Sequence, residues 1–132
     1  MNKVLKLLVL LPAILFVVTG VRWLVAPAGI APNFGLTLAD GIGLSSQVGD
    51  MAGFFLTLGS CMLIALISEH RSWYYPPMML LAITALGRIV AWLLHDATLA
   101  VSQITVEVVV ALILLLASRR LPQALSTKGL NG

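Results

Sequence analysis

Residues 75–118 read YPPMMLLAITALGRIVAWLLHDATLAVSQITVEVVVALILLLAS, and they contain the clearest evidence of the fold class. It contains two apolar runs, about residues 75–94 and 99–118, separated by the short segment His95-Asp96-Ala97-Thr98. Each run has about 20 residues, enough for a helix rising about 1.5 Å per residue to cross a hydrocarbon core of about 30 Å. The stretch therefore predicts two membrane-spanning helices joined by a tight turn, that is, a helical hairpin.

Two further apolar runs precede this hairpin, at about residues 4–25 and 48–67. Only an α-helix satisfies its own backbone hydrogen bonds within such a run, and the alternation typical of a barrel strand is absent from the sequence. We therefore predict an all-α integral membrane protein, a single domain built as a bundle of four transmembrane helices. Residues 119–132 are predicted to form a polar tail.

The composition favours a membrane protein over a soluble one. Of the 132 residues, 60% are hydrophobic and only 10% are charged, whereas a soluble domain needs far more charge to cover its surface. The formal net charge is +3, but the cations flank apolar runs, so we predict no nucleic-acid binding. The predicted partner is the lipid bilayer.

The positions of the cations predict how the bundle is oriented. With four spans, these cations fall on one side of the membrane: Lys3, Lys6, Arg71, Arg119, Arg120 and Lys128. The positive-inside rule identifies that side as the cytoplasm, so both termini are predicted to be cytoplasmic. Arg22 ends the first span on the opposite, outer side.

The first run has an alternative interpretation. Lys3, Lys6, the apolar run and the small residues Ala26-Pro27-Ala28 resemble a secretory signal followed by its cleavage site. The length of the run, and Arg22 and Trp23 within its last residues, favour a retained helix. Cleavage stays open as the alternative, and it would leave three spans.

The segment Ala26–Gln47 is the one substantial loop that the sequence predicts. It is rich in glycine and proline but also apolar, and it lies on the outer side. We favour an interfacial connector, with a cap lying on the bundle as the alternative. Aromatic residues near span ends are predicted to form interfacial belts: Trp23, Trp73, Tyr74, Tyr75 and Trp92.

A stripe of small residues follows the second run at every fourth position: Gly49, Gly53, Thr57, Cys61 and Ala65. Small residues on one face let another helix approach closely, and this is how helices gain packing in lipid. The stripe therefore predicts a helix-packing face. We favour a partner helix within the chain, and a homo-oligomer or another membrane protein stays open.

Two charged residues lie inside the runs of the hairpin. Arg88 is seven residues before His95, and Glu107 is nine residues after Thr98. Arg88 is therefore roughly 10 Å deep and Glu107 roughly 12 Å deep on neighbouring helices, counting about 1.5 Å per residue. Charges at this depth usually face the bundle interior and pair, so we predict an Arg88–Glu107 ion pair in the outer half of the bundle.

Further polar residues are predicted near this pair, and each has a structural interpretation as well. Asp50 at the start of the second span could contribute to a binding cluster or simply complement a helix dipole. His95 could contribute or be a solvated turn residue. Gln103 is one helical turn from Glu107. The candidate binding residues are therefore Arg88, Glu107, Asp50, Gln103 and His95, and the Arg88–Glu107 pair could equally serve only to set the register of two helices.

The sequence contains no motif that predicts catalysis. A metalloprotease helix, a nucleophile elbow and a phosphate-binding loop are all missing from it. Cys61 is the only cysteine and there are two histidines, which excludes a disulfide and the usual zinc sites. We therefore predict no enzyme, no catalytic residue, no metal and no cofactor.

The order of these features resembles a known family. The matching features are four spans, the outer segment Gly35-Leu36-Thr37-Leu38 through Gly43, a glycine-bearing second helix from Gly49 to Gly59, the motif Leu86-Gly87-Arg88, and Glu107. From about Leu5 to Leu116 the chain resembles the small bacterial membrane family catalogued as domain of unknown function 4345, and more distantly the DoxX-type four-helix membrane proteins. The resemblance implies a four-helix bundle in a bacterial inner membrane, with no activity to transfer.

Two functions fit these features. The first is an accessory or structural subunit that packs against other membrane helices, and this is the function we predict. The alternative is a binding or transport protein for a small molecule or proton, because charged residues within a membrane mark sites by default. The two differ in whether Arg88 and Glu107 are needed for folding or for a ligand.

Overall fold

The computed structural model describes the backbone of residues 2–131 and the side chains of residues 2–121. Its four long helices are α1 (Asn2–Val25), α3 (Gly41–Ser68), α4 (Tyr75–Leu94) and α5 (Val101–Asn131). Three short elements connect them: α2 (Pro27–Ile30), η1 (Ala31–Phe34) and η2 (Arg71–Tyr74). Among the described residues, four helices are long and apolar enough to cross a membrane, which confirms the predicted all-α, four-helix architecture.

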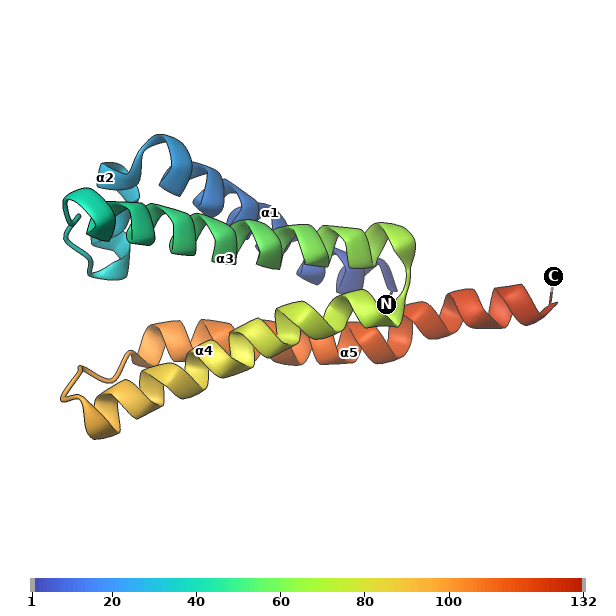
Figure 1. Ribbon diagram of the computed structural model, residues 1–132. Coiled ribbons are helices and arrows are strands. Elements are labelled where there is room, and N and C mark those ends of the chain that lie inside the picture. The colour runs from blue at the N-terminus through green and yellow to red at the C-terminus, as the bar shows by residue number, and fades with distance from the viewer. Residues whose placement is uncertain (1, 132) are drawn as a thin grey trace.

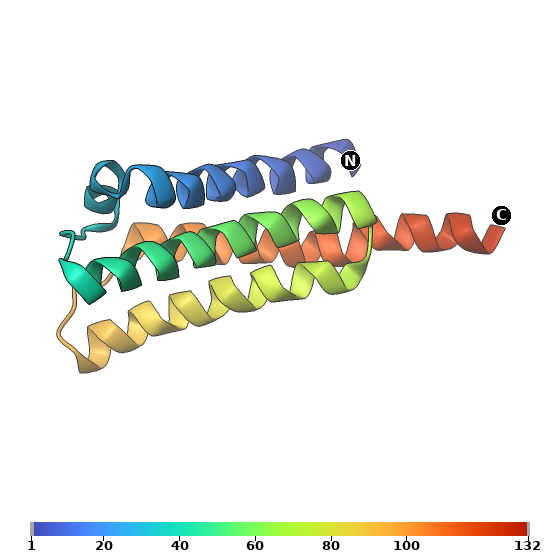
Figure 2. The same cartoon turned by 45° about the horizontal axis from the view of Figure 1, so that its top comes forward.

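The helices form two hairpins that lie side by side (Figures 1 and 2). One hairpin pairs α1 with α3 and the other pairs α4 with α5, while α1 contacts α5 and α3 contacts α4 across the bundle. The N-terminus, the connection between α3 and α4, and the far end of α5 lie at the same end of the molecule (Figure 2). We call this the terminal end, and the opposite one the loop end.

Two glycines bring α1 and α3 into close contact. A Cβ atom added at Gly59 would lie 2.6 Å from Val17 Cγ2 and 2.7 Å from the carbonyl oxygen of Ala13. A Cβ added at Gly20 would lie 2.6 Å from Leu56 Cγ. Backbone contact through small residues is therefore the basis of this hairpin.

The predicted stripe on α3 does not face one partner along its whole length. Cys61 and Ala65 are buried, but Gly49, Gly53 and Thr57 are exposed, and a Cβ at either glycine would meet nothing within 4 Å. The prediction that Gly49 and Gly53 pack against a helix of this chain is therefore wrong. The reason is geometric, because each step of four residues turns the stripe by about 40° around a helix with 3.6 residues per turn.

Two predicted boundaries also change. The helix α3 begins at Gly41, so residues 41–47 of the predicted loop are helical. The Gln47 side chain stabilises this start, since its Oε1 accepts a hydrogen bond from the Ala39 N–H (2.8 Å) and its Nε2 donates to the Thr37 carbonyl (3.0 Å). At the other end of the chain, residues 119–131 of the predicted polar tail continue α5 as a helix.

The link between α4 and α5 confirms the predicted hairpin turn. The helix α4 ends at Leu94, and Asp96 follows in the left-handed conformation with φ 58°. The Ala91 carbonyl accepts two hydrogen bonds at this helix end, from the His95 N–H at 3.0 Å and from the Ala97 N–H at 3.1 Å. The chain reverses here and enters α5 at Val101.

An aromatic cluster closes the loop end of the α1–α3 hairpin. The Trp23 ring lies 6.0 Å from that of Phe34, which in turn lies 5.3 Å from that of Phe55, measured between ring centroids. Trp23 is fully buried and Tyr74 is 1% exposed, so the prediction of both as interfacial belt residues is wrong. For Trp23 the reason is that η1 folds Phe34 back over the end of α1.

Candidate functional site

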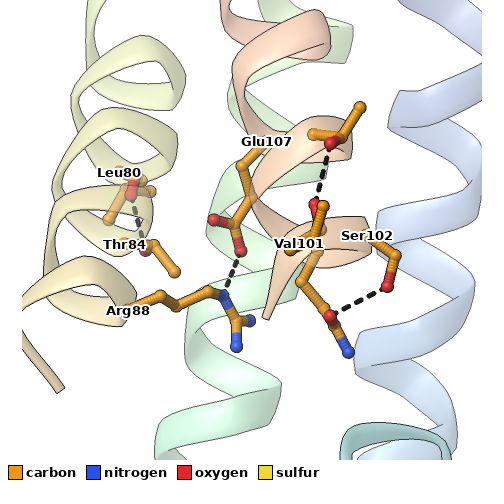
Figure 3. A network of polar contacts seen from close by, with 8 residues as sticks. Leu80, Thr84, Arg88, Val101, Ser102 and Glu107 are labelled. Atoms are coloured by element: carbon orange, nitrogen blue, oxygen red, sulfur yellow. Dashed lines mark hydrogen bonds and ion pairs between the residues drawn. The ribbon is translucent and has the colours of Figure 1, made fainter. Parts of the chain in front are cut away.

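The charged residues of α4 and α5 form the predicted ion pair. The Arg88 Nε donates to Glu107 Oε1 at 2.7 Å (Figure 3). Arg88 lies six residues before Leu94, the end of α4, and Glu107 lies six residues after Val101, the start of α5. The hairpin turn therefore brings the two side chains to the same depth, about 9 Å from the loop end of each helix.

The two partners are buried to different extents. The side chain of Glu107 is 10% exposed, whereas that of Arg88 is 33% exposed. The protein therefore encloses nearly all of the Glu107 side chain, whereas about a third of the Arg88 side chain remains accessible from outside. Removing a carboxylate from water is costly, and an opposite charge at close range offsets part of that cost.

The pair leaves hydrogen-bonding capacity unused. Glu107 Oε2 is buried and has no hydrogen-bond partner in the described part of the chain. Arginine and carboxylate often pair through two parallel hydrogen bonds, whereas here one bond from Nε is formed. The site therefore holds one acceptor oxygen, and the two terminal nitrogens of Arg88 extend away from Glu107 (Figure 3).

Thr84 and Gln103 lie near the pair but bond elsewhere. The Thr84 hydroxyl, one turn before Arg88, donates to the Leu80 carbonyl at 2.6 Å (Figure 3). The Oε1 atom of Gln103, which is half-buried, accepts from the Ser102 hydroxyl at 3.0 Å. Both groups are thus satisfied on their own helices.

Asp50 and His95 stand apart from the ion pair. Both are exposed, and within residues 2–121 neither side chain forms a hydrogen bond or salt bridge with Arg88 or Glu107. Asp50 lies in the third turn of α3, because that helix begins at Gly41. The interpretation of Asp50 as a first-turn residue that complements the dipole is therefore wrong. Of the five candidates, the structure joins Arg88 and Glu107 alone by a direct contact.

A groove of about 450 Å³ runs between α4 and α5 beside the pair. Of the residues whose side chains are described, Glu107 is the one polar residue that lines it, and the others are apolar, among them Leu81, Ala85, Ile104 and Ala111. The sequence analysis missed this groove. The available signal was small residues on both helices, Ala82 and Ala85 three residues apart on α4 and Ala111 on α5, which leave room for a groove.

A second buried polar group without a partner was also missed. Within the described residues, Trp23 Nε1 is buried and has no hydrogen-bond partner. An indole N–H is a donor only, so it calls for an acceptor. No three His, Cys, Asp or Glu side chains among the described residues are grouped so as to hold a metal ion.

Comparisons with protein-family models, with curated proteins and with solved structures found no match to this chain. The resemblance described from the sequence therefore stays a prediction. Inferences about function rest on the geometry of the chain itself, and above all on the half-satisfied Arg88–Glu107 pair.

Proposed function

We propose that the chain is a multi-pass protein of a bacterial inner membrane that binds a small polar ligand or a proton at the Arg88–Glu107 pair. The observation that carries this proposal is the buried Glu107 Oε2 without a partner. An unsatisfied polar atom in an apolar setting costs free energy. A pair that served packing alone would gain by closing its second hydrogen bond, so the free oxygen favours a ligand.

The chemistry of the free groups indicates what the ligand carries. Glu107 Oε2 accepts a hydrogen bond, whereas the terminal nitrogens of Arg88 only donate. A complementary ligand therefore presents a donor next to an acceptor, as an amino acid, a carboxylic acid or a primary amide does. Oε2 is buried, so we propose entry past Arg88, the more exposed partner.

The orientation follows from the same positive-inside argument. Lys3, Lys6 and Arg71 belong to elements that meet at the terminal end of the bundle. Cations of short flanking segments favour the cytoplasmic side. We therefore propose that both termini are cytoplasmic and that the pair opens toward the outer side.

The test is a thermal-shift screen on the protein in lipid nanodiscs, with amino acids, short carboxylic acids and amides as probes. A ligand present at about 100 times its Kd stabilises a protein by about 2.7 kcal/mol. We expect at least one probe class to raise the Tm of the parent and of Asp50→Asn, an exposed carboxylate used as the control. The same probe should leave Glu107→Gln and Arg88→Lys unchanged.

The contrary outcome is also defined. If no probe shifts the Tm, and the exchanged pair Arg88→Glu/Glu107→Arg is as stable as the parent, the pair serves to hold α4 and α5 together. The proposal of a binding site would then be abandoned.

A second candidate function, an accessory subunit that packs against another membrane helix, is supported by the exposed part of α3. Gly49, Gly53 and Thr57 are exposed there, and small residues allow close approach of a helix. Gly53→Leu should leave the Tm of the monomer unchanged and abolish association, measured by cross-linking in membranes. Unchanged association would remove this candidate.

A further inference from the structure

A second groove, away from the Arg88–Glu107 pair, lies between α1 and α3 at the terminal end. It has a volume of about 390 Å³ and is lined by Lys3, Lys6, Leu7, Leu10, Leu66 and Ile67. Two cations thus border a groove whose other walls are aliphatic. It is independent of the ligand site proposed above, because it shares no residue with it.

The two lysines present their charge on one side of α1. Lys3 and Lys6 are three residues apart, so their side chains are neighbours on the helix surface. Lys6 has one acidic neighbour, with its Nζ atom 3.8 Å from Glu69 Oε1, and its side chain remains 51% exposed. At that distance the contact is a loose ion pair, and the local charge of the two lysines and Glu69 remains positive.

The apolar walls indicate what these cations face. Leu7 and Leu10 continue α1 away from Lys3 and Lys6, and Leu66 and Ile67 lie opposite them on α3. A free phosphate ion would use the lysines and leave this apolar surface uncovered. A molecule with an anionic head and an aliphatic chain matches both parts, with its head at the membrane surface and its chain along the helices.

We propose that this groove binds one anionic phospholipid, with its phosphate between Lys3 and Lys6 and an acyl chain against Leu7, Leu10, Leu66 and Ile67. Lysines near any helix end extend their charge toward the membrane surface. The groove adds a defined place for the chain, which a row of surface lysines does not provide. The proposal therefore predicts one retained lipid and a dependence on groove shape.

The experiment is native mass spectrometry of the full chain in a neutral detergent, titrated with phosphatidylglycerol or with phosphatidylcholine. The parent should retain one phosphatidylglycerol, and bind phosphatidylcholine at least tenfold more weakly. Lys3→Gln/Lys6→Gln should weaken phosphatidylglycerol binding about 30-fold, at about fivefold for each lysine. Lys3→Gln alone should weaken it about fivefold, and it keeps the contact between Lys6 and Glu69.

Two matched controls separate the groove from general charge and from general apolar contact. Arg119→Gln/Arg120→Gln removes the same charge from α5, outside the groove, and should leave binding within twofold of the parent. Leu7→Trp fills the groove and keeps both lysines, and it should weaken binding at least tenfold. Leu8→Trp places the same bulk on a neighbouring exposed position that does not line the groove, and should have no effect.

Four outcomes would overturn the proposal. Equal loss in the arginine control would indicate general electrostatic attraction. Unchanged binding in Leu7→Trp would indicate that no chain occupies the groove. Equal retention of phosphatidylcholine would remove the role of the anionic head. Full competition by glycerol 3-phosphate, which has the head without chains, would identify a site for a free phosphate group.

Discussion

The two hairpins of this molecule are packed in different ways. In the α1–α3 hairpin, Gly20 and Gly59 bring the helix backbones together, and Phe34 and Phe55 close the loop end. In the α4–α5 hairpin, a groove of about 450 Å³ lies between the two helices beside Glu107. Burial differs most between α3 and α4, at 39% and 17% of their most apolar 18-residue stretches, whereas α1 and α5 are alike at 28%. One hairpin therefore supplies tight packing, while the other leaves room beside Glu107.

A substitution that separates α1 from α3 should have the greatest effect on stability. We expect Gly59→Leu to lower the free energy of unfolding by about 3 kcal/mol, because overpacking a tight contact forces the backbones apart. Gly53→Leu is the matched control on the same helix, where nothing lies within 4 Å of an added Cβ. Unfolding in mixed micelles measures both. Equal losses for the two variants would show that close contact at Gly59 is not the basis of the hairpin.

In the looser hairpin, we expect the ion-pair partners to be unequal. Arg88→Leu should cost about 2 kcal/mol, because it leaves the Glu107 carboxylate buried and unpaired. Glu107→Leu should cost less, because the Arg88 side chain is 33% exposed and Glu107 is 10% exposed. The double variant Arg88→Leu/Glu107→Leu should be as stable as the parent, as expected when apolar residues replace a buried pair. The same unfolding assay decides, and a double variant weaker than either single variant would contradict this account.

The start of α3 depends on a smaller contact. Gln47→Ala removes two hydrogen bonds, to the Ala39 N–H and to the Thr37 carbonyl. We expect a loss of about 1 kcal/mol, with increased hydrogen exchange in residues 37–47, because each of these two bonds near the surface contributes about 0.5 kcal/mol net. Gln103→Ala in α5 serves as the control, since its bond to Ser102 is local. If exchange in residues 37–47 became faster in Gln103→Ala but not in Gln47→Ala, the role of Gln47 would be refuted.

At Asp50 we expect almost no effect. The residue is exposed and outside the ion pair, and surface substitutions of this kind usually change stability by less than about 0.5 kcal/mol. Asp50→Ala should therefore match the parent in the unfolding assay. A loss above about 1 kcal/mol would indicate that Asp50 belongs to the polar site after all.

The number and type of the long helices could be predicted from the sequence, because a run of about 20 apolar residues carries both the length of a helix and its membrane environment. The Arg88–Glu107 contact could be predicted as well. Because the turn between α4 and α5 is short, the depth of a residue follows from its distance along the helix from that turn. Arg88 is six residues from the end of α4, and Glu107 is six residues from the start of α5. Both results depend on residues near one another in the chain.

Tertiary structure decided which face of each helix meets a neighbour. The spacing of small residues does not show how a helix is rotated relative to its neighbour. Only the position of Val17 on α1 shows that Gly59 is in close contact with another helix and Gly53 is not. The helical start of α3 depended on bonds from Gln47 back to residues 37–39. Likewise, the free oxygen of Glu107 and the two grooves result from how whole helices pack, which no local pattern records.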